Sequence, residues 1–231
     1  MTFGEQANRE NPMITQLKER TNRDLEVLIQ IARHAWGVYQ IWWFIIGFPT
    51  RRDTLDTMNE YPAYFGAIED ALQTALLIDL CKLYDTDKKA VSIGKLLEIG
   101  QQCGVITGEE GTALVDRVLQ QSAILGKLRL LRDKLLAHRE KGMTAIKAFE
   151  QAQITPNQIR DFTKETVSIL NRVMYISQRT TWHLDEQVGY DTRSLFDDLK
   201  RYHANERAFY GNDPRANRGR IKRTVVARCR R

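Results

Sequence analysis

The chain has 231 residues, of which 42% are hydrophobic and 28% are charged, and its formal net charge is +6. This is the composition of an ordinary soluble globular protein, and it excludes disorder of the whole chain. The three cysteines, Cys81, Cys103 and Cys229, form neither a CxxC pair nor an even set, so they support neither a disulfide framework nor a zinc site. We therefore expect one domain with tails, no metal and no cofactor.

The N-terminal segment and the most apolar segment bear on where the protein works. Residues 1–11 are polar and lack the cationic and apolar regions of a signal peptide. The stretch Ala35 to Phe48 has fourteen residues, with Gln40 inside it, which is short of the roughly 18 to 20 that span a bilayer. We expect a cytoplasmic protein that does not enter a membrane.

Two long helices are predicted in the first third of the chain. Apolar residues between 13 and 47 recur every three or four positions, which predicts one long helix or two shorter ones. Pro49 should end this helix, and a polar loop is expected up to about Asn59. A second long helix is predicted over 61–84. Asp79 lies inside its apolar stripe and will need a partner.

Capping signals place two helices in the middle of the chain. Ser92 can cap a short helix that runs to Cys103 and stops at Gly104. Thr107 and Glu110 have the spacing of a capping box, and the helix that they open is expected to reach about Glu140.

Two further helices are predicted in the last third. Thr155, Pro156 and Gln158 repeat the capping signal, with proline at the first helical position, and this helix should continue towards Leu184. A last helix should begin at Asp191 or Thr192 and end at residue 211. No segment alternates with period two for long enough to be a strand. The fold class is therefore all-α, a bundle of long antiparallel helices over 13–211, with a flexible N-terminus over 1–12.

The positive charge is concentrated at the C-terminal end, in the tail 212–231. Between 214 and 231 the tail holds no acid and eight cations, so the rest of the chain sums to −2; the cations are Arg215, Arg218, Arg220, Lys222, Arg223, Arg228, Arg230 and Arg231. Such an arm commonly stays flexible and binds the phosphates of a nucleic acid. The alternative is a tail that only improves solubility.

The segment 128–139, LRLLRDKLLAHR, carries the candidate chemistry. On a helix with about 100° per residue and Leu128 at zero, the apolar arc runs from about 300° to 80°. Arg132 falls near 40°, inside this arc, and His138 falls near 280°, at its edge. A desolvated guanidinium is costly unless it is paired or opens onto a wet cleft or an interface.

The same placement separates Arg132 from His138 by about 120° around the axis and about 9 Å along it, so one phosphate is not easily held by both. A second copy packed across a two-fold axis would bring two arginines and two histidines to one cleft, which predicts a homodimer. The alternative is a purely structural role, with a histidine at the edge of the core and an arginine that extends its guanidinium to solvent.

The motif resembles a known superfamily. Arg132-Asp133-x4-His138 is similar to the Arg-x(4 to 6)-His signature of the HEPN superfamily, including the polar residue that follows the arginine. The longer string LRDKLLAHR resembles the AbiU-type abortive-infection branch. The order of helices around the motif is similar too, over roughly residues 13–177. The last helix and the basic arm lie outside the resemblance.

The resemblance implies a HEPN-like helical bundle that dimerises with its motifs facing each other, often as a metal-independent endoribonuclease. His138 would then transfer a proton, Arg132 would hold the scissile phosphate, and Asp133 would orient Arg132 or close the dimer. RNA would also meet Arg139 and the arm residues Arg215, Arg218, Arg220, Lys222 and Arg223. The expected setting is a toxin–antitoxin or antiphage abortive-infection system, with a cognate antitoxin or sensor as a further partner.

Two observations limit this interpretation. Some toxins of the superfamily carry a tyrosine two residues after the histidine, where a partner enzyme modifies them, but this chain has Glu140 there. Control by that route is therefore not expected. Because some members do not cleave RNA, the alternative is a non-catalytic helical module that binds nucleic acid or regulates a partner.

The other candidate residues are weaker. His34, His183 and His203 show no partner spacing for a metal, and Trp36, Trp42, Trp43 and Trp182 fit a core or a dimer seam better than a base-stacking surface.

Overall fold

The computed structural model describes residues 11–137 and 144–210, and within these residues the regular structure is helical, with no strand. The helices in chain order are α1 (Pro12–Ile46), α2 (Phe48–Glu60), α3 (Pro62–Leu83), α4 (Ile93–Gln102), α5 (Gly108–Gln120), α6 (Ser122–Arg132), the π turn η1 (Asp133–Ala137), α7 (Ala145–Ala152), α8 (Pro156–Gln178) and α9 (Gln187–Tyr210). The predicted all-α class is confirmed.

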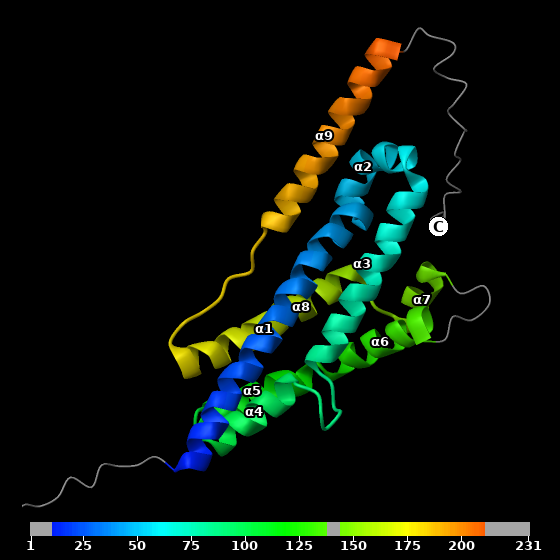
Figure 1. Cartoon of the computed structure of the whole chain (residues 1–231). Helices are drawn as coiled ribbons and strands as arrows, with labels where there is room; N and C mark the ends of the chain where they lie inside the picture. The colour runs from blue at the N-terminus through cyan, green and yellow to red at the C-terminus, as the bar shows by residue number, and fades with distance from the viewer. Residues whose placement is uncertain (1–10, 138–143, 211–231) are drawn as a thin grey trace, which may run out of the picture.

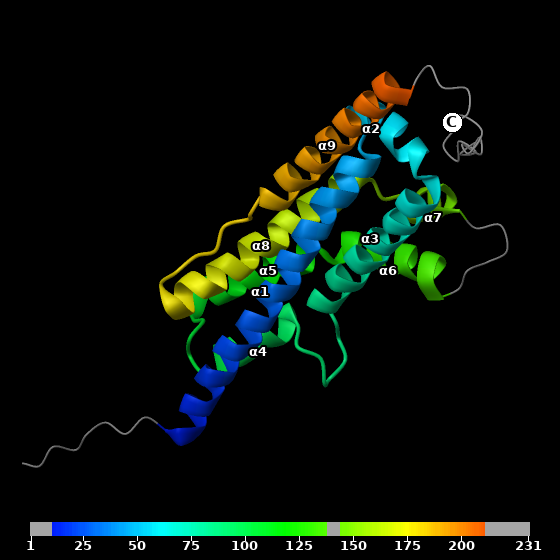
Figure 2. The same ribbon diagram turned by 45° about the horizontal axis from the view of Figure 1, so that its top comes forward.

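Helix α1 is the centre of the bundle. In Figure 1 it runs antiparallel to α3 on one side, has α9 on the other, and is crossed behind by α8. It contacts α3, α8, α4 and α9, and α3 in turn contacts α6. Figure 2 shows the same arrangement from another side, with α6 beside the end of α3 that carries residue 83. The motif helix is thus held against the C-terminal end of α3.

The core explains why α1 is one helix of 35 residues and not two. Leu25, Leu28, Ala32 and Ala35 are fully buried along its length, and Trp36 and Trp42 are nearly so. A continuous apolar stripe of this kind stabilises a helix by burial rather than by its intrinsic propensity. Trp36, Trp42 and Trp182 are buried in this chain, and Trp43 packs against the core, in agreement with the predicted core role.

A smaller cluster joins α2 and α9 to the bundle through Ile45, Met58, Phe65 and Phe196. The sequence-based prediction missed α2, because it took Pro49 as a stop and 50–59 as a loop. Gly47 is extended at ψ 134°, and the proline then lies in the first turn of a new helix, where its missing N–H costs nothing. Thr54 is buried, but its hydroxyl bonds to the Thr50 carbonyl at 3.2 Å, so a polar side chain faces inward without penalty.

The predicted single helix from Thr107 to about Glu140 is wrong. At Gln121 ψ is −8° and the N–H bonds to the Val118 carbonyl, three residues back, so the chain tightens there and α5 ends before α6 begins. The Thr107 side chain makes no cap bond, and Glu110 pairs instead with Arg172 of α8. Tertiary pairing has replaced the local capping box.

The last third differs mainly at the helix ends. The capping box at Thr155 is present, with the Thr155 N–H on Gln158 Oε1 at 2.9 Å and the Gln158 N–H on Thr155 Oγ1 at 3.3 Å. Helix α8 stops at Gln178, short of the predicted Leu184, because Arg179 adopts the left-handed conformation at φ 55°. Asp185 accepts the Gln187 N–H at 2.7 Å, so α9 begins before Asp191. Helix α7 was not predicted.

Candidate functional site

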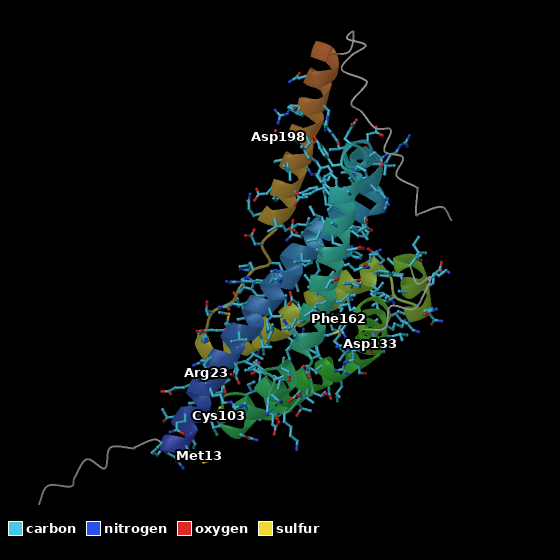
Figure 3. All side chains as sticks on the ribbon, turned by 45° about the vertical axis from the view of Figure 1, so that its right-hand side comes forward. Met13, Arg23, Cys103, Asp133, Phe162 and Asp198 are labelled. Carbon is cyan, nitrogen blue, oxygen red and sulfur yellow. The ribbon has the colours of Figure 1, made fainter. Side chains whose placement is uncertain are left out.

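The motif begins where α6 ends. Arg132 is the last residue of α6, and Asp133 is the first residue of η1. Figure 3 labels Asp133 at this end of α6, on the side where α7 packs. His138 and Arg139 lie outside the described residues, as do Arg215, Arg218, Arg220, Lys222 and Arg223 of the arm. The described part of the motif is therefore its first half, Arg132 and Asp133.

Asp133 pairs with Arg132. The Arg132 Nε and Nη2 groups both donate to Oδ1 of Asp133, at 2.9 and 2.7 Å. The two side chains are 39% and 46% exposed, so the pair is open to solvent. The guanidinium is thus compensated inside the chain, by an ion pair at the edge of the core whose charged atoms are accessible.

The C-terminal end of α3 packs against Arg129 and Arg132 of α6. Arg129 donates from Nη2 to the Tyr84 carbonyl at 3.0 Å, which caps α3. Cys81 is buried beside Arg132 and Arg129, and the charge of Asp85 also acts on Arg132. The sequence alone did not connect these residues to the motif, because 45 positions separate Tyr84 from Arg129 and no local pattern reports that contact.

Local interactions shift two pKa values at this site. The hydrogen bond from Arg132 to Asp133 raises the pKa of Arg132 further, so the guanidinium keeps its charge. Burial raises the pKa of the Cys81 thiol, and the nearby arginines oppose this only in part. A thiol with a raised pKa stays protonated near neutral pH and is a poor nucleophile. Arg132 is thus the group here that is suited to bind an anion.

The π turn changes the register that a straight helix would give. A π turn closes i→i+5 bonds and so holds one residue more per turn, which rotates the following side chains by about 100° from their α-helical positions. Leu136, within the turn, is 37% exposed, whereas Leu128 and Leu131, before the turn, are fully buried. The wheel position predicted for His138 lies outside the described residues.

The resemblance predicts that Asp133 orients Arg132 or closes the dimer. The expected contact of Asp133 with Arg132 is present.

Asp79 has the partner that its place in the apolar stripe required. Its Oδ2 lies 2.5 Å from Nδ1 of His34 on α1, and Lys82 Nζ lies 4.0 Å from its Oδ1. A buried carboxylate paired in this way joins α1 to α3. His34 therefore has a structural explanation that needs no metal.

Other features of the described residues offer no competing catalytic centre. A hollow of about 450 Å³ lies between α1 and the α8–α9 connection, lined by Arg33, Trp36, Gly37, Trp182, His183, Asp185 and Val188. Arg33 already lies over the Trp182 ring, 5.0 Å from its centroid. Within 11–137 and 144–210, no group of three or more His, Cys, Asp or Glu side chains is placed to hold a metal ion, and no helix is long and apolar enough to cross a membrane.

Comparison with known proteins identifies the family. The model of the AbiU2 family of HEPN proteins matches residues 14–196, which cover the whole bundle from α1 to the first part of α9. No curated protein and no solved structure matches the chain significantly. The match contains the motif segment and exceeds half of the chain. It agrees with the family resemblance seen in the sequence, but it extends into α9, which was expected to lie outside that resemblance. The chain belongs to the AbiU2 family, an abortive-infection branch of the HEPN superfamily.

Proposed function

We propose that this protein is a metal-independent endoribonuclease of a toxin–antitoxin or antiphage abortive-infection system, and that it works as a homodimer. The observation that carries the proposal is the solvent-accessible, Asp133-bound guanidinium of Arg132, at the head of an Arg-x5-His motif in a member of the AbiU2 family. A guanidinium fork is the side-chain group best matched to a phosphodiester.

The proposed chemistry divides between Arg132 and His138. Cleavage of RNA by its own 2′-hydroxyl needs that proton removed and one returned to the leaving oxygen, and an imidazole can do either near neutral pH. His138 takes this role. Arg132 binds the scissile phosphate and stabilises the charge that accumulates on its oxygens. The products are a 2′,3′-cyclic phosphate and a 5′-hydroxyl end.

The proposed dimer supplies the second set of catalytic groups that a single motif lacks. The half-exposed Arg132 lies at an end of the bundle where α6, η1 and α7 meet, and a second copy related by a two-fold axis would double each catalytic group in one cleft. Asp133 orients Arg132 or closes this dimer. Arg139 and the basic arm, from Arg215 to Lys222 and Arg223, hold the flanking RNA by phosphate contacts.

The test is cleavage of single-stranded RNA in the presence of a metal chelator. We expect the wild-type protein to cut, and both His138→Ala and Arg132→Ala to lose at least a hundredfold in rate. Proton transfer by a positioned side chain contributes about 10²–10⁴-fold, and one donor to a developing oxyanion contributes about 10²–10³-fold. Lys127→Ala is the matched control: Lys127 is also a cation of α6, but it bonds to the Gln153 carbonyl at 2.8 Å, away from the motif. Equal cleavage by wild type and His138→Ala would rule the proposal out.

The alternative is a non-catalytic module that binds RNA through its arm or holds an antitoxin or sensor protein. Family membership is compatible with it, because HEPN domains also serve without catalysis. It predicts RNA binding or a protein complex without cleavage by any variant. The same assay therefore separates the two.

A further inference from the structure

The ion pair at the motif occupies the atoms that a phosphate would need. Nε and Nη2 of Arg132 form one edge of the guanidinium, with two roughly parallel N–H groups, and both point at one oxygen of Asp133. This edge is the one that binds a carboxylate or a phosphate in bidentate fashion. The Asp133 carboxylate therefore already fills it.

We propose that Asp133 is an internal competitor for the oxyanion that Arg132 binds, so that an RNA phosphodiester reaches this edge only by displacing the Asp133 carboxylate. The inference rests on the proposed function, because it takes an RNA phosphate as the ligand of Arg132. It adds that Asp133 sets the affinity of the site, and not only the orientation of the arginine.

The exposure of the pair makes such an exchange feasible. At 39% and 46% exposure, both side chains are hydrated, and ion pairs of this kind contribute little net stability. A displaced Asp133 carboxylate can return to water without a large desolvation cost. The surroundings favour an incoming anion only in part, because Arg129 lies nearby but Asp85 adds a negative charge that acts on Arg132.

The chain contains a matched pair elsewhere. Arg160 and Asp161 of α8 are also adjacent, and Nε and Nη2 of Arg160 lie 3.0 and 2.9 Å from one oxygen of Asp161, with exposures of 39% and 65%. Neither residue is among the charges that act on Arg132. Asp161→Asn therefore removes the same charge from the same kind of pair, away from the motif.

The test is equilibrium binding, in the full chain, of a fluorescent single-stranded oligonucleotide with 2′-O-methyl groups, which has no 2′-hydroxyl and cannot be cut. Asp133→Asn keeps the shape of the side chain and weakens the competitor, so we expect its Kd to fall about two- to fivefold, the range that an exposed ion pair supports. Asp133→Ser should do the same. Asp161→Asn should leave the Kd within experimental error, and Asp85→Asn, which removes only a nearby charge, should lower it less than Asp133→Asn.

The gain in RNA affinity that Asp133→Asn produces must also depend on Arg132. In the Arg132→Ala background, Asp133→Asn should give no further gain, since the competed group is gone. The inference is overturned if the Kd of Asp133→Asn equals or exceeds that of the wild type, or if neither protein binds the oligonucleotide. It is also overturned if Asp133→Asn lowers the Kd in the Arg132→Ala background. Melting temperatures check that each variant is folded. Because the probe cannot be cleaved, a failure here is separate from a failure of the nuclease assay.

Discussion

Tyr84 shows how one residue can hold the motif in place from another helix. Its carbonyl accepts from Arg129 of α6, and its hydroxyl lies 2.8 Å from Thr166 Oγ1 of α8. The residue is almost fully buried, and burial raises the pKa of Tyr84 to about 12. It joins α3, α6 and α8 directly beneath the arginines.

The pH dependence of stability should report this burial. The folded state keeps the Tyr84 proton that the unfolded chain loses above about pH 10. The contribution of protonated Tyr84 to the free energy of unfolding is therefore complete below that pH and is lost as the pH rises towards about 12. In denaturant titrations we expect Tyr84→Phe to flatten this alkaline decline by up to about 1.4 kcal/mol per pH unit. At neutral pH it should cost about 1 kcal/mol.

Tyr39 gives the matched comparison. Its pKa is also raised to about 12 by burial, but its buried hydroxyl has no hydrogen-bond partner within the described residues. Tyr39→Phe should flatten the alkaline decline in the same way, yet leave stability at neutral pH unchanged or raise it by about 1 kcal/mol. A neutral-pH loss equal to that of Tyr84→Phe would contradict this account of the two hydroxyls.

At the scale of single residues, the sequence indicated which side chains could carry chemistry, but not which residues of other helices contact them. Arg132 could be selected because a cation inside the apolar arc of a leucine-rich helix stands out, and Asp133 because the resemblance to the HEPN superfamily includes it. Cys81, Tyr84 and Asp85 could not be selected, because they reach the motif only through the packing of α3 on α6. The π turn was equally invisible, since most of its residues, DKLLA, are good helix formers.

At the scale of elements, two capping signals of the same type had different outcomes. Thr155 and Gln158 form the reciprocal bonds, whereas Thr107 makes no cap bond and Glu110 pairs with Arg172. The local pattern is therefore sufficient to start a helix, but a partner across the bundle can take one of its members. Sequence alone does not reveal that competition.

This difference predicts unequal costs for one substitution. Thr155→Ala removes a formed cap and should lower the free energy of unfolding by about 1 kcal/mol. Thr107→Ala removes a hydroxyl that makes no cap bond and should cost clearly less. Urea titrations of both variants measure this, and equal losses would show that the two helix starts do not differ as described.

Gly47 determines the break between α1 and α2. A Cβ added there would collide with the Trp43 carbonyl and lie 2.9 Å from an atom of the Trp43 ring. Gly47→Ala should therefore destabilise the protein by about 1–3 kcal/mol, as overpacking does. Gly66 of α3 has nothing within 4 Å of an added Cβ, so Gly66→Ala should stabilise by about 0.5–1 kcal/mol. Thermal melts that move in the same direction for both would be inconsistent with this.

At the scale of the whole molecule, the sequence predicted the class and most of the helices, because α1, α3 and α8 bury long stripes with helical spacing. Its errors concern where helices begin and end: an interruption at Gln121, a proline that starts α2 instead of opening a loop, and a left-handed Arg179 that ends α8. Each depends on one residue's backbone angles, which packing decides and periodicity does not report.

The division of charge between the bundle and the arm also belongs to this scale. Deleting residues 214–231 removes eight cations, and we expect weaker RNA binding. The slope of the logarithm of the RNA-binding constant against the logarithm of the salt concentration should become shallower by about 0.7 for each phosphate that the shortened chain no longer neutralises. Cleavage should persist at higher protein concentration, since the motif lies in the bundle. Complete loss of RNA affinity in a protein that does not cleave RNA would favour the non-catalytic module that binds through its arm alone.

The central claim is that Arg132 and His138 cut RNA by way of its 2′-hydroxyl. The most direct measurement is the chemistry of the RNA ends that the wild-type protein produces in chelator, with a substrate that carries one ribonucleotide among 2′-O-methyl nucleotides. The account predicts a 2′,3′-cyclic phosphate at that single position and no product from His138→Ala. A 3′-hydroxyl end, cutting at the methylated positions, or the same products from His138→Ala would contradict it.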